Sequence, residues 1–354
     1  MSKFYQIRVK DVRKETSDSV SIGFEIPENV KPLFSYQAGQ YITLSLEINK
    51  EKLRRAYSLC SSPSENDFRI AVKKVRGGRV STYLTEKLKV NDTVELLPPA
   101  GKFLISTQPE NNTIYVAFAA GSGITPIFSM LKEVLKNEPH STFYLYYCNK
   151  KNEDIIFKEE LNKLSEKYAT TFHLAYIFTQ EDTGNDLYHG RIDGEKAMQL
   201  LHTAKINDKT AHYFICGPNQ MIKSIKEKLE TTGVEKNQIH YEYFSSFETE
   251  NKKTETTEIR TASITIVMDG IETYFEMPRS GKNILDMAIE NGVDAPFSCK
   301  GAVCCTCKAK VTEGKAGMEM NYSLSDEEVE KGFILTCQAF PETDHVRVDY
   351  DEIF

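Results

Sequence analysis

The sequence predicts a multidomain protein that joins an antiparallel β-barrel, an α/β domain with a parallel sheet, and a small α+β domain. Its 354 residues exceed what a single hydrophobic core usually serves. The apolar pattern changes near residue 106, from short alternating stretches to strands that alternate with helices. A polar stretch at 246–260 reads as a linker, so we expect domains at 1–105, 106–245 and 261–354.

Residues 1–105 carry short stretches such as QYITLSLEI and FRIAVKKV, broken by Gly, Pro and Ser. One helix is expected near STYLTEKL. Alternation of this kind is typical of strands with one buried face. Several such strands in succession indicate a small antiparallel barrel.

Two segments of the predicted barrel suit a phosphorylated, aromatic ligand. In RAYS (55–58) a cation, a flat stacking face and a hydroxyl stand near the end of a strand. In GGRVST (77–82) a glycine pair opens the expected helix, where free N–H groups suit a pyrophosphate. Taken alone, each signal is weak, because a tetrapeptide such as R-x-Y-S often occurs by chance and a Gly-Gly before a helix is usually a turn and a cap.

From Thr113 onward, apolar strands alternate with helices, which is the signature of a parallel sheet in an α/β domain. The expected strands are TIYVAFAA, TFYLYYC, TFHLAYIF and HYFICG. The expected helices are 126–136, FKEELNKLSEKY and 219–231.

Two strand-to-helix junctions in this domain lie where open α/β sheets bind ligands. The first, AGSGITP (120–126), lets the backbone approach a diphosphate, and we expect Thr125 to cap the helix with Pro126 in its first turn. It lacks the third glycine of the full dinucleotide fingerprint. The second places Cys216 at the end of a strand, where a buried apolar role is the simpler alternative.

The last domain opens with two predicted strands around an Asp269-Gly270 turn, followed by a helix that ends on Gly292. From 261 to 354 there are 17 acidic and 8 basic residues, so this domain carries the negative charge of the chain. The acidic runs 325–330 and 348–354 are open to two interpretations, a solvated surface or a docking surface for a basic partner.

Four cysteines in this domain have the spacing C-x4-C-x2-C with a distant fourth, which is the plant-type arrangement for a [2Fe-2S] cluster. The predicted ligands are Cys299, Cys304, Cys307 and Cys337. Cys305 lies off this spacing and is expected to be a free thiol. The alternatives are a disulfide framework, which reduced thiols in the cytosol disfavour, and structural zinc, which favours paired C-x2-C knuckles.

Composition excludes two classes of partner. The net charge of −7 gives nucleic acid no reason to bind. No apolar run approaches the length of a membrane span. The opening MSKFYQIRVK has no apolar targeting segment, so we expect a cytoplasmic protein.

Read in order, RAYS, GGRVST, AAGSGITP, FICGP and EYF, followed by the cysteine loop, resemble the ferredoxin-NADP reductase superfamily fused to a C-terminal plant-type ferredoxin of the β-grasp fold. The resemblance covers essentially the whole chain. It implies that Arg55 binds flavin phosphates, that Tyr57 stacks on the flavin ring and that Ser58 lies near its N5 atom. The remaining flavin contacts that it implies are Val72, Lys73, Gly78, Val80, Ser81 and Thr82.

In the α/β domain, the resemblance implies that the nicotinamide nucleotide's diphosphate lies on the first junction. The residues concerned are Gly121, Gly123, Thr125 and Pro126. It also places Cys216 near the nicotinamide ring, and Glu242 and Phe244 close to the flavin. Ser58, Cys216 and Glu242 are therefore the expected catalytic residues.

The choice of nucleotide rests on Lys150 and Lys151, two cations where a 2′-phosphate would bind, with Arg191 as a further candidate. Relatives that prefer NADPH often have arginine at the first position, and a lysine pair is also an ordinary surface feature. We favour NADPH over NADH. We favour FAD over FMN because the 77–82 segment is intact.

The expected function is an NAD(P)H-dependent reductase that passes electrons through FAD and the cluster to an oxygenase component. NAD(P)H gives up a hydride and the cluster accepts one electron at a time, so a flavin must stand between them. The domain order is similar to that of oxygenase reductases, the phenylacetyl-CoA epoxidase system among them. The alternatives are another one-electron acceptor, such as a hybrid-cluster protein, hydroxylase or desaturase, or a non-enzymatic zinc or redox-sensing module.

Overall fold

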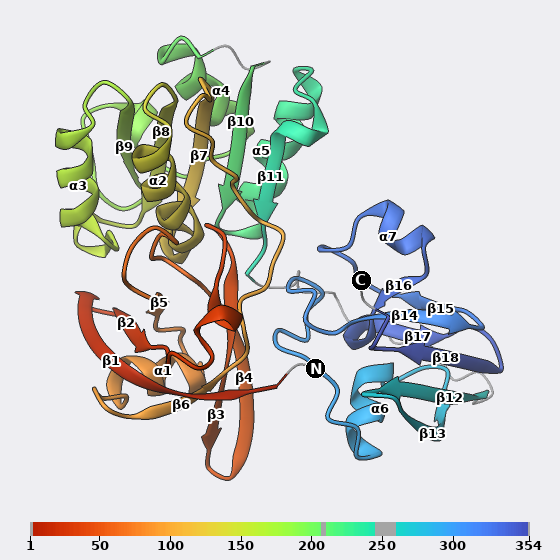
Figure 1. Ribbon diagram of the computed structural model, residues 1–354. Helices are drawn as coiled ribbons and strands as arrows, with labels where there is room; N and C mark the ends of the chain where they lie inside the picture. The colour runs from red at the N-terminus through yellow and green to blue at the C-terminus, as the bar shows by residue number, and fades with distance from the viewer. Residues whose placement is uncertain (1–2, 207–209, 245–259, 353–354) are drawn as a thin grey trace. The chain divides into compact units, whose positions relative to one another are not determined.

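The computed structural model describes residues 3–206, 210–244 and 260–352. These residues form two compact units, one over 4–244 and the other over the part described from 260 onward (Figure 1). The linker predicted at 246–260 lies outside the described residues, except for Arg260.

The first half of the 4–244 unit is a six-stranded antiparallel sheet in the order β4-β3-β6-β1-β2-β5. An antiparallel bridge between Leu59 and Ile70 joins its two edges, which closes the sheet into a barrel. The strands are β1 (Tyr5–Thr16), β2 (Ser19–Glu25), β3 (Tyr41–Ile48), β4 (Glu51–Ser58), β5 (Arg69–Lys73) and β6 (Thr93–Leu96). Helix α1 (Arg79–Glu86) and the 3-10 helix η1 (Lys31–Phe34) complete it.

Alternation along the strands explains why this segment forms a barrel. In β3, Ile42 and Leu44 are fully buried and belong to the same apolar cluster as Ile7, Ile22 and Ile70 from other strands. Side chains two positions apart on a strand point to one face, so this face is the barrel interior. The predicted antiparallel barrel is confirmed.

The second half of the unit is a parallel five-stranded sheet in the order β11-β10-β7-β8-β9. Its strands are β7 (Ile114–Ala120), β8 (Thr142–Asn149), β9 (Phe172–Phe178), β10 (Ala211–Cys216) and β11 (Ile239–Glu242). The helices are α2 (Ile124–Asn137), α3 (Lys158–Lys167), α4 (Gly194–Thr203) and α5 (Asn219–Thr231). Short 3-10 helices are η2 (Gly121–Gly123), η3 (Asn152–Asp154), η4 (Asp186–Tyr188) and η5 (Lys236–Gln238).

Helices cover both faces of this parallel sheet (Figure 1). Helices α2 and α3 share one apolar cluster with the sheet, and α4 and α5 share another. From β7 the chain runs outward through β8 and β9 and then returns to β10 on the other side of β7. The carboxyl ends of β7 and β10 are therefore the topological switch point, which is where open α/β sheets bind ligands.

Polar contacts from helix α2 tie the barrel to the α/β half. The Ser129 hydroxyl donates to the Ser61 carbonyl at 2.5 Å, and Lys132 pairs with Glu65 at 2.6 Å. The Ser62 hydroxyl also donates to the Glu133 carboxylate. These bonds hold the segment after β4 against the helix that begins at the switch point.

The 260–352 unit is an α+β domain around a mixed five-stranded sheet in the order β13-β12-β18-β14-β16. Its strands are β12 (Thr261–Met268), β13 (Ile271–Pro278), β14 (Lys308–Glu313), β16 (Phe333–Leu335) and β18 (His345–Asp349). A small second sheet joins β15 (Ala316–Met318) to β17 (Ala339–Pro341). The helices are α6 (Ile284–Glu290), α7 (Asp326–Glu330) and the 3-10 helix η6 (Thr336–Gln338).

The local predictions for this domain are confirmed. Asp269 and Gly270 both have positive φ, at 53° and 71°, as a two-residue hairpin turn requires. Gly292 follows helix α6 with φ of 84°, which ends the helix. Buried Leu285 and Ala288 of α6 pack in the same apolar cluster as the sheet residues, in the β-grasp arrangement.

Within the described ranges, no helix is long and apolar enough to cross a membrane.

Candidate active site and cluster loop

Three predicted residues from three separate segments come together at the carboxyl edge of the parallel sheet. The Ser58 hydroxyl, at the end of β4, donates a hydrogen bond of 3.3 Å to Oε2 of Glu242, at the end of β11. Cys216, the last residue of β10, pairs with Glu242 in the β10–β11 register. The barrel and the parallel sheet thus meet through a hydroxyl, a thiol and a carboxylate.

The Cys216 thiol is held in its neutral form. The residue is 0% exposed, and burial raises the pKa of the thiol well above its usual range. The nearby Glu242 carboxylate raises it further. A thiol in this state is a weak nucleophile, so Cys216 is suited to shape a binding surface and not to attack a substrate.

The two strand-to-helix junctions pack backbone against backbone at the switch point. A Cβ atom on Gly123 would lie 2.1 Å from the Cys216 carbonyl oxygen, so no other residue fits there. Gly121 has φ of 54°, in the left-handed region that favours glycine. Its carbonyl accepts a 2.9 Å hydrogen bond from the Tyr147 hydroxyl, which fixes the loop.

The prediction that Thr125 caps helix α2 is wrong. The 3-10 turn η2 runs directly into α2, so the helix already begins at Ile124 with Gly123 in the capping position. Thr125 is buried inside the first turn, and its hydroxyl donates back to the Ser122 carbonyl at 3.0 Å. Pro126 lies in the first turn as predicted, where its missing N–H costs no hydrogen bond.

On the barrel, Arg55 and Tyr57 lie two positions apart on β4 and so share one face of that strand. The Arg55 side chain is exposed, and one of its nitrogens donates to the Arg54 carbonyl at 2.7 Å. Tyr57 is half-buried, and burial raises the pKa of its hydroxyl. This leaves a cation free to meet an anion beside an aromatic ring.

On strand β5, the backbone is available to a ligand and the Val72 side chain is not. Val72 is fully buried in the barrel core, whereas Lys73 pairs with Asp18 at 3.6 Å between nitrogen and oxygen. Val80 of helix α1 is likewise buried in the core. A ligand beside these positions can therefore contact them through main-chain groups.

The glycine pair does open helix α1, as predicted. Gly77 has φ of 74° and Gly78 is the capping residue. The Ser81 hydroxyl accepts from the Val75 N–H at 3.1 Å and donates to the Gly78 carbonyl at 3.3 Å, so it holds the turn. The Thr82 N–H bonds the Gly78 carbonyl at 3.1 Å. The N–H groups of the first turn remain suited to an anion.

At the end of β8, Lys150 is exposed and Asn149 is buried. Asn149 is only 5% exposed, and neither atom of its amide has a hydrogen-bond partner among the described residues. It lies beside the Tyr147 hydroxyl, whose bond goes to the Gly121 carbonyl. Arg191 is also exposed, and its positive charge interacts electrostatically with the Cys148 thiol.

Phe244 is the last described residue of its unit. Its side chain is 41% exposed. It follows Glu242 by two positions, so it lies close to the end of β11.

The four predicted cluster ligands are gathered as two pairs of thiols. Cys299 lies within hydrogen-bonding distance of Cys304, and Cys307 of Cys337. Contact with its partner raises the pKa of Cys299 and lowers that of Cys304, because one proton is shared between them. The Gly301 N–H donates to the Cys299 sulfur at 3.3 Å.

This arrangement fits a binuclear cluster. Two irons that share sulfides need two thiolates each, and the thiols are gathered two by two. Cys305 stands outside both pairs, with its thiol donating to the Ser323 carbonyl at 3.3 Å.

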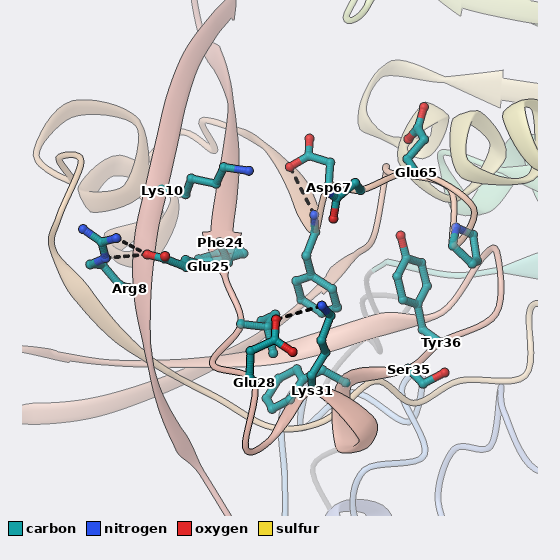
Figure 2. A pocket seen from close by; sticks show the side chains of 15 residues that line it. Arg8, Lys10, Phe24, Glu25, Glu28, Lys31, Ser35, Tyr36, Glu65 and Asp67 are labelled. Carbon is teal, nitrogen blue, oxygen red and sulfur yellow. Dashed lines mark hydrogen bonds and ion pairs between the residues drawn. The ribbon is translucent and has the colours of Figure 1, made fainter.

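A cavity of about 610 Å³ lies elsewhere on the barrel, between β1, β2, η1 and the segment 63–68 (Figure 2). Its walls mix aromatic rings with charges, and Arg8 pairs with Glu25 as Lys31 does with Glu28. None of the predicted site residues lines it. It is separate from the site at Ser58 and Cys216.

Sequence reasoning missed two buried polar groups, the amide of Asn149 and the hydroxyl of Ser298. Both residues adjoin predicted ones, Lys150 and Cys299. Residue type and spacing gave no signal for either, because only the packed structure reveals that their polar atoms lack partners.

Three domain families match the chain in succession. The oxidoreductase FAD-binding domain matches residues 6–105, the oxidoreductase NAD-binding domain residues 118–227, and the 2Fe-2S iron-sulfur cluster binding domain residues 266–342.

Relatives of known function match over nearly their whole length. The chain is 38% identical to one of the subunits of 1,2-phenylacetyl-CoA epoxidase from Escherichia coli, over 99% of both chains. It is 31% identical to the ferredoxin reductase component of 3-ketosteroid-9-alpha-monooxygenase from Rhodococcus rhodochrous, over 97% of this chain and 96% of that protein. The crystallised phthalate dioxygenase reductase shares the fold, with a TM-score of 0.62, 24% identity and 98% of both chains covered.

Proposed function

This chain belongs to the ferredoxin-NADP reductase superfamily with a C-terminal plant-type ferredoxin, and we propose that it passes electrons from NAD(P)H through FAD and a [2Fe-2S] cluster to an oxygenase component. It is an NAD(P)H-dependent oxidoreductase with an FAD-binding, an NAD-binding and a cluster-binding domain. We place the domain boundaries at 1–105, 106–245 and 261–354, with a linker between the last two.

The observation that carries the proposal is the meeting of Ser58, Cys216 and Glu242. They come from the barrel, from β10 and from β11, at the edge of the sheet where a nicotinamide would reach a flavin held on the barrel. When bound, FAD supplies the conversion of a hydride into single electrons. The role of the protein is to hold the two rings at a productive distance and orientation and to exclude water.

On the barrel we assign the flavin phosphates to Arg55 and to the first turn of α1, with Gly78, Ser81 and Thr82. The exposed guanidinium and the glycine cap support this assignment. Tyr57 offers its ring for stacking. Val72, Lys73 and Val80 contribute through the backbone, since the valines are buried in the core.

Ser58 and Glu242 form a positioning pair. A hydroxyl that donates to a carboxylate has a fixed orientation, so the Ser58 oxygen would keep lone pairs available to a bound ligand. The Glu242 carboxylate also lies near the buried Cys216 thiol. We propose that Phe244 covers the flavin ring, since its own ring is exposed at the end of the unit.

For the nicotinamide nucleotide we assign the diphosphate to the Gly121–Gly123 turn and the first residues of α2, Thr125 and Pro126 included. The close packing of Gly123 on the Cys216 backbone supports this assignment, because it holds the turn at the switch point. Lys150 is the candidate for a 2′-phosphate, which favours NADPH. The buried amide of Asn149 stands next to it as a further hydrogen-bonding group.

In the last domain we assign the cluster to Cys299, Cys304, Cys307 and Cys337. The paired thiols and the Gly301 N–H aimed at sulfur support this. The acidic residues of α7 offer a docking surface for a basic acceptor. We propose an oxygenase component as that acceptor, with phenylacetyl-CoA epoxidase as the first candidate from the 38% identity, and the cytoplasm as the location.

The test is a visible spectrum of the full chain purified without oxygen, followed by acceptor reduction. We expect flavin absorption together with a [2Fe-2S] charge-transfer band, and NAD(P)H-driven reduction of a purified epoxidase oxygenase component. A colourless protein that carries zinc would overturn the proposal. If the chain holds both cofactors but reduces a hydroxylase or desaturase and not the epoxidase, only the proposed acceptor would be wrong.

A further inference from the structure

Next to the first cluster cysteine stands a hydroxyl that has no hydrogen-bond partner among the described residues. Ser298 directly precedes Cys299 and is 2% exposed. Its Oγ atom is buried and makes no hydrogen bond to any described residue. An unpaired buried hydroxyl destabilises the folded state, so the folded protein is expected to supply a partner.

The other hydroxyls around the thiols do have partners in the protein. Ser323 donates to the Ala302 carbonyl at 2.9 Å, and Thr336 donates to the Cys307 carbonyl at 3.0 Å. Thr306 reaches the Cys304 carbonyl at 3.5 Å. Each of these side chains stabilises the loop by a hydrogen bond to a backbone carbonyl. Ser298 thus differs from them, because its hydroxyl has no acceptor in the part of the chain that the structure describes.

We propose that Ser298 donates its hydroxyl hydrogen to a sulfur atom of the [2Fe-2S] cluster and thereby tunes the cluster's reduction potential. The inference rests on the ligand assignment made above. Thiolate and sulfide sulfur are the strong acceptors that the cluster adds next to Cys299, and hydrogen bonds to cluster sulfur are a known means of setting the potential.

The sign of the effect follows from charge. Reduction adds one negative charge to the cluster, and a hydrogen-bond donor stabilises the more negative state more strongly. Removal of the hydroxyl therefore makes the cluster harder to reduce. A net hydrogen-bond contribution of about 1 kcal/mol corresponds to an approximately fivefold fall in the equilibrium constant for cluster reduction.

The test compares Ser298→Ala with the unchanged full chain in a redox titration followed by electron paramagnetic resonance. We expect Ser298→Ala to keep its iron and sulfide and to shift the midpoint potential downward. We also expect loss of one exchangeable proton coupling to the reduced cluster. Ser298→Thr, which restores a hydroxyl, should recover the potential and the coupling.

Thr336→Val is the matched control, because it removes a buried hydroxyl that already has a protein partner beside a cluster cysteine. It should lower thermal stability and leave the proton coupling in place. An unchanged potential in Ser298→Ala with a full cluster overturns this inference alone, and would indicate a buried water as the partner. Absence of iron and sulfide from the unchanged chain would instead overturn the ligand assignment itself.

Discussion

In residues 4–244 the chemical groups are brought together by the register of two sheets, whereas in residues 260–352 three of the four predicted ligands come from one loop and the fourth, Cys337, from η6. Ser58 and Glu242 are 184 positions apart and meet because β4 and β11 end at the same place. Cys299, Cys304 and Cys307 lie within one short segment. The first site depends on how two sheets pack, and the second depends mainly on the local course of the chain.

The backbone reflects this difference. At the switch point, Gly123 lies so close to the Cys216 carbonyl that no Cβ fits between them. In the cysteine loop, Lys300, Ala302 and Cys305 all have positive φ, between 50° and 62°. Non-glycine residues adopt such angles at a cost of about 1 kcal/mol or more each, which a bound cluster can offset.

The largest effect is expected from Cys304→Ser. Loss of one thiolate should abolish cluster assembly, so delivery of electrons to a one-electron acceptor falls to background. Flavin reduction by NAD(P)H should continue, because its site lies in the other unit. Acceptor reduction and flavin bleaching are measured side by side. Cys305→Ser is the control and should retain the cluster, and loss of both activities in Cys304→Ser would contradict the comparison.

Ser58→Ala should slow hydride transfer by about a hundredfold, because it removes the hydroxyl that orients the reacting ring. Stopped-flow bleaching of the flavin at saturating NAD(P)H measures this rate. The barrel offers a matched serine in Ser45, which donates to Glu95 at 3.1 Å. Equal slowing in Ser45→Ala would mean that the barrel was merely destabilised.

Gly123→Ala should destabilise the 4–244 unit by about 2–3 kcal/mol and raise the KM for NAD(P)H. The new methyl would overlap the Cys216 carbonyl, which is backbone and cannot move aside. Urea unfolding and steady-state kinetics measure the two effects.

Gly121→Ala is the comparison for Gly123→Ala. Nothing lies within 4 Å of its added Cβ, so only its positive φ matters, at about 1 kcal/mol. If both variants lost the same stability, the packing account of this site would be wrong.

The last expected effect is a loss of folding stability at acidic pH. Burial, and secondarily His212, lowers the pKa of His240 to about 4. The unfolded chain takes up this proton near pH 6.5 and the folded chain does not, so stability is present above pH 6.5 and is lost as the pH falls toward 4. We expect a loss of about 1–2 kcal/mol at pH 5.

His240→Phe should remove this loss while keeping the ring stacked on Phe214, which lies 4.7 Å away between centroids. Urea unfolding at pH 7 and pH 5 provides the measurement. An equal pH dependence in the variant would assign the loss to other groups.

Much of this architecture could be predicted because its signals are local. Alternation reveals the barrel, strand–helix alternation reveals the parallel sheet, and the Asp269-Gly270 pair reveals the hairpin. The helix start at Ile124 could not be predicted from Thr125 and Pro126, because the preceding 3-10 turn already supplies helical backbone. Helix α4 escaped notice although Asp193 caps it through the Lys196 N–H.

The two candidate sites also differ in whether their sequence signals are local. The cysteine spacing is a local signal, so the paired thiols were expected from the sequence. The Ser58–Glu242 hydrogen bond depends on how the barrel and the sheet pack. No spacing rule in the sequence relates residues that are 184 positions apart. The free polar atoms of Asn149 and Ser298 are visible only once neighbouring groups have been given their partners.

The most direct test mixes the full chain with NAD(P)H in a stopped-flow spectrometer without oxygen. The account predicts two phases, loss of flavin absorption followed by loss of cluster absorption, with the second phase missing in Cys304→Ser. Cluster reduction that proceeds without prior loss of flavin absorption, or a chain with no cluster absorption at all, would contradict it.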